Sequence, residues 1–251
     1  MRITHISDTH NKHKQLNGKL PGGDLLIHSG DFTSVGREHE VKNFVNWFNE
    51  IDNYTNKVFI AGNHDLTFDS EILLKNKLEY FERRPYPNEN PSMGKPQWLE
   101  MILEIGLNPN VFYLENSFVE LDQIKIWGSP YSATFGYGWA FNVDRGHDSA
   151  QMWNGIPTDT DIVITHGPIY GYGDRTAHTY ENVGCSDLFH RLNELKTPLH
   201  FAGHIHEGYG FNPTFWGGYS FNGCTCNLRY EALNNPITFD YDFSTKELEF
   251  V

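Results

Sequence analysis

Five apolar, strand-like runs in this chain are each followed within a few residues by Asp, Asn or His. Their β-branched and aliphatic residues are typical of strands buried on both faces of a sheet. Ligands collect at the carboxyl ends of strands in open α/β sheets, so we expect the residues after these runs to form one site. These residues are Asp8, His10, Asp31, Asn63, His64, His166, His204 and His206.

The first three runs are predicted to be parallel strands. The predicted elements are strands at residues 2–7, 24–28 and 57–61 and an amphipathic helix at residues 36–51. Successive strand–crossover–strand units of this kind require parallel strands with right-handed connections. Asp8, Asp31 and Asn63 would therefore lie at one edge of one sheet.

The remaining elements are predicted with different degrees of detail. Residues 85–96 are rich in Pro and Asn and indicate a loop that either covers the site or crosses the surface. The other predicted elements are helices at 69–81, 97–105 and 184–195, strands at 161–165 and 199–202, two or three strands within 111–127 that turn at Glu115-Asn116, and an antiparallel sheet at 214–251 that turns around 234–236.

His204 and His206 are separated by one residue, a spacing that does not place two side chains on one helix face. On a strand end or a tight turn the two imidazoles point the same way, and Gly203 would free the backbone to turn there. A pair of surface histidines is the alternative for such a motif in isolation. The complementary residues at the other strand ends favour a shared site.

The segment from Tyr131 to Phe141 interleaves aromatic residues with glycines. Aromatic side chains in such a loop can form a wall for stacking a base. They can equally pack onto the sheet, and both interpretations stay open.

The net charge of −13 argues against non-specific binding to nucleic acid or to an anionic membrane, since no basic excess exists to release counterions. Bound divalent ions would still allow a small anionic substrate. Three cysteines fit a reducing compartment, and a metal or redox site at Cys224-x-Cys226 would need further partners. Without an apolar leader, a membrane-length span or a linker, residues 1–251 are expected to form one cytoplasmic domain.

The candidate ligands combine carboxylates, imidazoles and one amide oxygen. This mixture suits divalent Mn, Fe or Zn. One zinc ion needs three or four ligands, so seven candidates and a spare histidine call for two ions, with Asp31 as the natural bridge. Two ions about 3.5–4 Å apart can clamp the attacking and leaving oxygens of a phosphoryl transfer, with a hydroxide between them as nucleophile.

The order of motifs resembles the calcineurin-like metallophosphoesterase superfamily. The motifs are D-x-H at residue 8, G-D at residue 30, G-N-H-D at residue 62, H-G at residue 166 and G-H-x-H at residue 203. Longer matches at 61–69, 127–130, 166–168 and 202–210 resemble the metallophosphoesterase domain-containing protein family, which is associated with cyclic-nucleotide and related phosphodiesters.

The resemblance implies a four-layer α/β/β/α sandwich with two mixed sheets. It also implies one ion held by Asp8, His10, Asp31 and His206 and a second ion held by Asp31, Asn63, His166 and His204. His64 would be the unligated acid that protonates the leaving group, and Asp65 could orient its imidazole. The departures from the family lie in the aromatic loop and in residues 171–183, so the resemblance implies least about substrate choice.

The leading hypothesis is a metal-dependent phosphoric ester hydrolase that cleaves small phosphodiesters, cyclic nucleotides among them. Arg175 is the nearest cationic candidate to the motifs, and a dianionic monoester would want more positive charge than one arginine. A phosphomonoesterase or protein phosphatase is the neighbouring alternative. A metal- and nucleotide-binding regulatory module with little turnover is the alternative from another class.

Overall fold

The computed structural model describes residues 1–69 and 106–251. The predicted loop at 85–96, the predicted helix at 97–105 and all but the first residue of the predicted helix at 69–81 lie outside the described residues. The description below concerns the two described ranges.

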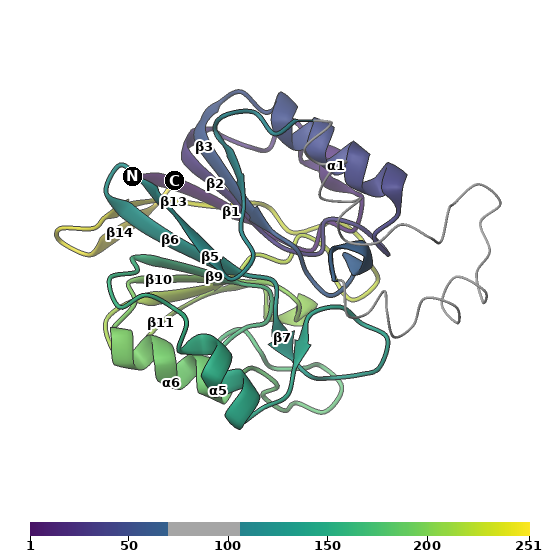
Figure 1. The fold of residues 1–251 in the computed structure, drawn as a ribbon. Helices are drawn as coiled ribbons and strands as arrows, with labels where there is room; N and C mark the ends of the chain where they lie inside the picture. The colour runs from purple at the N-terminus through teal and green to yellow at the C-terminus, as the bar shows by residue number, and fades with distance from the viewer. Residues whose placement is uncertain (70–105) are drawn as a thin grey trace.

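Two six-stranded sheets form the centre of the molecule (Figure 1). The first sheet has the order β14-β13-β1-β2-β3-β4, in which β1 to β4 are parallel and β13 and β14 are antiparallel to their neighbours. Its strands are β1 (Arg2–Ile6), β2 (Gly23–Ser29), β3 (Tyr54–Ile60), β4 (Val111–Tyr113), β13 (Ile237–Asp242) and β14 (Glu247–Phe250).

The second sheet has the order β11-β12-β10-β9-β6-β5, with four parallel central strands and an antiparallel strand at each edge. Its strands are β5 (Ser117–Leu121), β6 (Ile124–Ser129), β9 (Ile162–Thr165), β10 (Leu199–Ala202), β11 (Gly210–Pro213) and β12 (Tyr219–Asn222). A separate pair consists of β7 (Ser132–Ala133) and β8 (Asn142–Val143).

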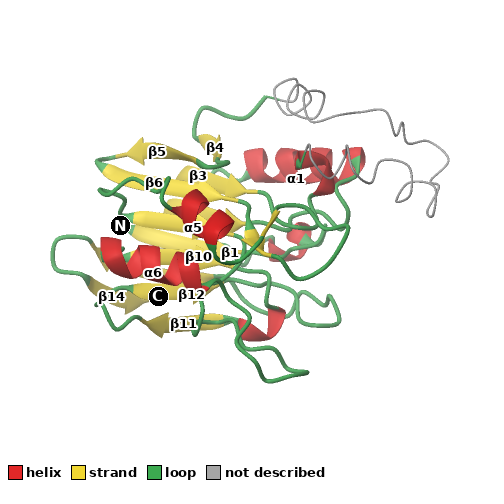
Figure 2. Ribbon diagram, turned by 60° about the horizontal axis from the view of Figure 1, so that its bottom comes forward, coloured by secondary structure: helices red, strands yellow, loops and turns green. Residues whose placement is uncertain are grey.

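Helices cover the outer face of each sheet (Figures 1 and 2). Helix α1 (Glu38–Glu50) packs on the first sheet, and α5 (His147–Trp153) and α6 (Ser186–Leu195) pack on the second. Short 3-10 helices lie at η1 (His13–Leu16), η2 (Leu66–Phe68) and η3 (His206–Gly208).

The cores follow from the two-residue period of the strands. In β2, Leu25 and Ile27 point between the sheets, whereas Leu26 points toward α1. In β9, Ile162 and Ile164 face the first sheet, and Val163 faces α5 and α6. The predicted four-layer α/β/β/α sandwich with two mixed sheets is therefore confirmed, and the assignment of residues 1–251 to one domain stays a prediction.

The predicted turn at Glu115-Asn116 is wrong as a hairpin. Strand β4 pairs with β3 in the first sheet, whereas β5 pairs with β6 in the second, so residues 114–116 carry the chain from one sheet to the other. The hairpin turn lies at Asp122 and Gln123, both in the left-handed region with φ of 50° and 69°. Two such residues are the hallmark of a type I′ turn, here made without glycine.

The predicted antiparallel sheet at 214–251 is confirmed only for β13 and β14, which pair antiparallel with each other. Strand β12 joins the second sheet parallel to β10, whereas β13 and β14 extend the first sheet from the edge of β1. The C-terminal segment thus supplies strands to both sheets. Local alternation predicts a strand but does not reveal its partner. Helix α5, which lies beside α6, was not predicted.

The carboxyl ends of the parallel strands lie together at one end of the sandwich. The Ser7 N–H donates to the Gly223 carbonyl at 2.8 Å, and the Gly203 N–H donates to the His166 carbonyl at 2.9 Å, so backbone bonds tie the strand exits together there. No helix in the described ranges is both long enough and apolar enough to cross a membrane.

Candidate metal centre

The structure brings the predicted site residues of both sheets to one place. There are three sets of three residues, and within each set the ligand atoms lie within 4.8 Å of one another. These sets are Asp8 with His10 and His206, His10 with Asp31 and His64, and Asp8 with Asp31 and His166.

His10 and His206 face each other through their Nε2 atoms, which lie 3.2 Å apart. The Nδ1 atom of His206 lies 2.8 Å from the Asn227 carbonyl, and that of His10 lies 3.3 Å from the Thr33 carbonyl. A carbonyl only accepts, so each Nδ1 carries a hydrogen, and each Nε2, once free of its proton, would turn a lone pair toward the other. Two lone pairs at this distance fit a cation between them, and backbone carbonyls commonly orient metal-binding histidines in this way.

A second group of ligand atoms surrounds the amide oxygen of Asn63. Its Oδ1 lies 2.9 Å from Nε2 of His166 and 2.7 Å from Nδ1 of His204. His166 Nδ1 donates to the Ser29 carbonyl at 3.0 Å, which turns its Nε2 toward Asn63 and toward Oδ2 of Asp31 at 3.4 Å. Imidazole, amide and carboxylate donors therefore converge as a divalent ion requires.

Asp31 lies between the two groups. Its Oδ2 is 3.9 Å from Nε2 of His10 and 3.4 Å from Nε2 of His166, one member of each group. This position fits the predicted bridge. The roles of Asp8, His10, Asp31, Asn63, His166, His204 and His206 as ligands stay predictions.

The electrostatics of the centre demand positive charge. Burial disfavours protonation of His166 and His206, yet the Asp31 and Asp8 carboxylates outweigh burial and raise the pKa of each histidine to about 9. Burial also favours a neutral Asp31, but the surrounding histidines, His166 foremost, lower its pKa. Protons supply the compensating charge here, and divalent ions at the same lone pairs would displace those protons.

His64 lies at the margin of the centre. Its Nδ1 is 2.7 Å from the Ser34 carbonyl, its Nε2 is 4.0 Å from Oδ2 of Asp31, and its backbone N–H donates to Oδ1 of Asp31 at 2.7 Å. The ring is held between His10, at 4.6 Å between centroids, and Trp139, at 4.3 Å. Its Nε2 thus points at the centre from a fixed direction.

Asp65 does not orient His64 as expected, since the Nδ1 atom of that ring contacts Ser34. The buried Asp65 carboxylate instead accepts hydrogen bonds from the backbone N–H groups of Gly62, Asp31 and Thr33, at 2.8, 3.0 and 2.9 Å. Asp65 therefore ties the exits of β2 and β3 together. The prediction was based on the adjacency of Asp65 and His64 in the sequence, and adjacency does not determine the direction in which the Asp65 carboxylate points.

The backbone of the centre adopts a conformation that is costly for residues other than glycine. Asp8, His10, Asp31 and His204 all have positive φ, at 49°, 41°, 54° and 67°. Such residues cost on the order of 1–3 kcal/mol each and cluster at functional sites.

Gly203 has a different role from the predicted one. It is His204, with its positive φ, that turns the chain, whereas a Cβ on Gly203 would lie 2.1 Å from both Oδ2 of Asp8 and Oγ of Ser7. Gly62 is similar, since a Cβ there would lie 2.3 Å from Oδ1 of Asp31. Both glycines let candidate ligands approach the backbone closely.

Two residues that sequence reasoning missed hold the Asp8 carboxylate. The Ser7 hydroxyl donates to Oδ2 of Asp8 at 2.6 Å, and the Cys224 thiol donates to the same oxygen at 3.2 Å. Burial and the Asp8 charge raise the pKa of Cys224 well above its usual range, so the thiol keeps its hydrogen. The Cys-x-Cys motif is evident in the sequence, but Asp8, the partner of Cys224, lies 216 residues away along the chain.

Aromatic side chains flank the imidazoles on two sides. Tyr230 contacts His10 and His206, with ring centroids 4.8 and 5.3 Å apart. Phe135 contacts His204 edge-on at 4.6 Å, and Trp139 covers His64. Both interpretations of residues 131–141 therefore apply in part, because Tyr131 and Phe141 pack on the core under α1 while Phe135 and Trp139 border the centre.

Comparisons with known proteins agree with this geometry. The family model described as calcineurin-like phosphoesterase matches residues 1–208. Human metallophosphoesterase domain-containing protein 1 is 39% identical over 245 residues, which cover 95% of this chain and 70% of that protein.

Solved structures share the fold at much lower sequence identity. The Thermus thermophilus protein TT1561 superposes with a TM-score of 0.62 at 11% identity, covering 99% of this chain and 96% of that one. A phosphopantetheinyl hydrolase from Mycobacterium tuberculosis superposes with a TM-score of 0.58 at 14% identity, covering 91% and 90%. The predicted metallophosphoesterase fold is confirmed, and the chain belongs to the calcineurin-like phosphoesterase family, whose members hydrolyse phosphoric esters.

Proposed function

We propose that this protein is a phosphodiesterase that uses two divalent ions to hydrolyse small phosphodiesters, cyclic nucleotides among them. The observation that carries the proposal is the charge around the centre. Every ion pair that Asp8 and Asp31 make with described residues is to a histidine, and none is to lysine or arginine.

Two carboxylates, two divalent ions and the hydroxide nucleophile leave a net charge of about +1 at the centre, counted as four positive and three negative charges. A diester carries one negative charge and meets this field directly. A dianionic monoester or a protein phosphate is usually held in addition by arginine side chains, which the described part of the centre lacks. The charge count therefore supports a diester as substrate.

The chain's own groups have separate tasks in this proposal. Bound divalent ions would neutralise charge on the phosphoryl oxygens and lower the pKa of water to supply a nucleophile. One ion would be held on the side of Asp8 and His206, and the other on the side of Asn63 and His204. Asp31 would contribute to both sides. Ser7 and Cys224 orient the Asp8 carboxylate.

His64 is proposed as the general acid. In the protonated ring Nδ1–H donates to the Ser34 carbonyl, and Nε2–H is the proton presented to the departing alkoxide. The contact with Trp139 limits rotation of the ring. An acid held in this way favours turnover over a purely regulatory binding role.

The proposal is tested by turnover of the Mn-loaded protein on a matched panel. The panel contains methyl 4-nitrophenyl phosphate, a 2′,3′-cyclic nucleotide, 4-nitrophenyl phosphate and a phosphoserine peptide. We expect kcat/KM for the diesters to exceed that for the monoesters by at least about tenfold. A preference for 4-nitrophenyl phosphate or the peptide would make the protein a monoesterase, and binding without turnover would make it a regulatory module.

A further inference from the structure

The ring of Tyr230 lies against three imidazoles of the centre. Its centroid is 4.8 Å from that of His10, 5.3 Å from that of His206 and 6.0 Å from that of His64. The interplanar angles are 73°, 76° and 63°, so each imidazole is steeply inclined to the phenol ring. Tyr230 is 42% exposed, whereas His10 behind it is 3% exposed. The Tyr230 ring therefore separates these imidazoles from solvent on this side.

Tyr230 is held in this position by a strained backbone and by two neighbours. Its φ of 58° is a left-handed conformation that is costly for a residue other than glycine, and such residues cluster at functional sites. The Lys12 ammonium donates to the Tyr230 carbonyl, and the Tyr230 N–H donates to the Asn227 carbonyl at 2.8 Å. The same carbonyl accepts from Nδ1 of His206 at 2.8 Å. One carbonyl thus fixes both the His206 imidazole and the residue that covers it.

A ring in this place bears on an ion held between His10 and His206. The apolar shell around a metal site controls the access of water to the ligands and the local dielectric. The groups that orient metal-binding histidines from outside are typically worth about 10–100-fold in metal affinity. Tyr230 is such a group, because it contacts both imidazoles and shares the carbonyl that orients one of them.

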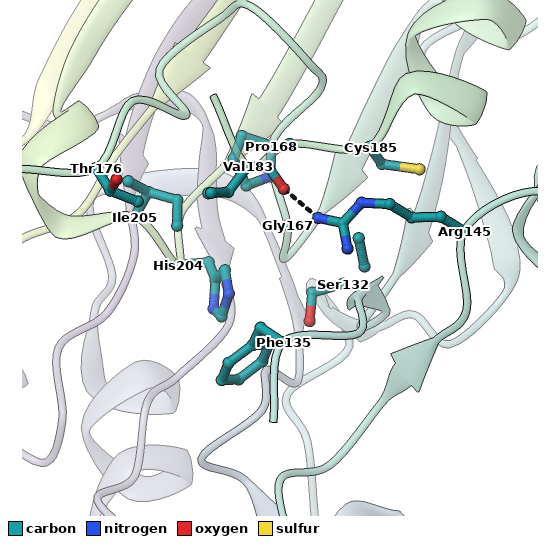
Figure 3. A pocket seen from close by; sticks show the side chains of 12 residues that line it. Ser132, Phe135, Arg145, Gly167, Pro168, Thr176, Val183, Cys185, His204 and Ile205 are labelled. Carbon is teal, nitrogen blue, oxygen red and sulfur yellow. Dashed lines mark hydrogen bonds between the residues drawn. The ribbon is translucent and has the colours of Figure 1, made fainter. Parts of the chain in front are cut away.

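The other side of the centre is arranged differently. His204 lines a cavity of about 210 Å³, and Figure 3 shows its imidazole and Phe135 facing this space. Within residues 1–69 and 106–251, the imidazoles that Tyr230 contacts are those named above and not those of His166 or His204. The cover that Tyr230 provides is therefore specific to one side.

We infer that Tyr230 is a positioning residue for one of the two ions, and that its ring closes the side of Asp8, His10 and His206 against water and tightens metal binding there. The ring makes these contacts, so the phenol hydroxyl is not required. The inference rests on the proposed function for the presence of two ions and is independent of which ester is cleaved.

The test measures Mn²⁺ binding to the metal-free protein by calorimetry, without substrate. Tyr230→Ala should weaken one of the two ions by about 10–100-fold and leave the other within about twofold of the unmodified protein. The unchanged ion shows that the fold is intact. Tyr230→Phe keeps the ring and should bind both ions as the unmodified protein does.

Two ligand variants identify the ion that is affected. His204→Ala should keep the ion on the side of His206, and His206→Ala should keep the ion on the side of His204. Adding Tyr230→Ala should weaken Mn²⁺ binding in the His204→Ala protein and not in the His206→Ala protein.

Tyr180→Ala is the matched control. Tyr180 also has a positive φ, of 59°, and its carbonyl also accepts from a basic side chain, Nε of Arg175 at 3.1 Å. The charged groups of Lys12 and Arg175 lie 6.0 and 5.8 Å from the centroids of the tyrosine rings that they contact. In the described ranges the ring contact of Tyr180 is with Arg175 and not with an imidazole, so its loss should change neither ion.

The outcomes separate this inference from the proposed function. Fewer than two Mn²⁺ ions in the unmodified protein would overturn the two-ion function. Two ions that Tyr230→Ala leaves unchanged or weakens equally would overturn the inference alone, as would a loss on the side of His204 or a failure of Tyr230→Phe to preserve binding.

Discussion

At the scale of single residues, His64 is where structure and chemistry meet most directly. Its Nε2 lies 4.0 Å from Asp31 and its Nδ1 contacts the Ser34 carbonyl, so the ring faces the centre from outside the groups around Asn63 and His206. The set of His64, His10 and Asp31 could also hold an ion. A substitution distinguishes the acid from the ligand.

We expect His64→Ala to slow hydrolysis of a diester with an alkoxide leaving group by ~10²–10⁴-fold, because a basic leaving group needs a proton. A nitrophenolate leaves without one, so that diester should be slowed far less. Metal content, measured by elemental analysis, should stay unchanged. His147→Ala is the control, since this histidine side chain is 86% exposed on α5. Equal losses on both substrates, or the loss of an ion, would make His64 a ligand.

At the scale of elements, helix α1 is attached to the first sheet by a buried lysine. Lys57 of β3 is 0% exposed, and its Nζ donates to the carbonyls of Phe48, Asn49 and Ile51 at 2.6, 3.2 and 2.5 Å. These carbonyls belong to the C-terminal end of α1, where the helix dipole favours positive charge. Burial lowers the pKa of this ammonium, with Asp52 opposing.

Lys57→Met keeps the apolar stem but leaves these carbonyls without their donor. We expect a loss of about 1–3 kcal/mol in the free energy of unfolding, measured in urea. Lys42→Met on the same helix is the matched control. Lys42 pairs with Glu38 in solvent, and a change of this kind usually stays within about 0.5 kcal/mol. Equal effects of the two substitutions would show that the buried ammonium adds nothing to stability.

At the scale of the whole molecule, the sandwich excludes water from polar groups deep in its sheets. His200 of β10 is 1% exposed, and its two ring nitrogens contact the hydroxyls of Thr165 and Ser220 at 2.9 Å each. Burial lowers the pKa of His200 to about 3. The unfolded chain, with a histidine pKa near 6.5, therefore binds one more proton at this site than the folded protein between these values.

Stability should consequently fall as the pH decreases from about 6.5 toward 3, by up to about 1.4 kcal/mol per pH unit for this histidine. We expect His200→Gln to be less stable at pH 7 but to lose stability less steeply on acidification, by about one proton. Urea unfolding of both proteins between pH 7 and pH 5 measures the two slopes. Parallel slopes would mean that His200 becomes protonated without unfolding.

Much of the centre was predictable because strand ends carry local signals. An apolar run followed by Gly and Asp, or by Gly and His, predicts both the strand and the direction of its exit. The predicted strand at 199–202 matches β10, and the residues after the predicted strands are those that meet in the structure. The mixture of donor types then pointed to divalent ions.

Tertiary structure decided the features that depend on distant partners. The C-terminal strands are divided between the two sheets, and β4 and β5 lie in different sheets although they are adjacent in sequence. Asp65 turns toward the backbone of Thr33 rather than His64, Cys224 reaches Asp8, and the buried Ser132 hydroxyl has no partner among the described residues. The sequence by itself determined which donor types the chain brings and at which strand ends, because strand periodicity and glycine are local properties. Only packing decided which atoms face each other, because hydrogen bonds and burial join residues far apart along the chain.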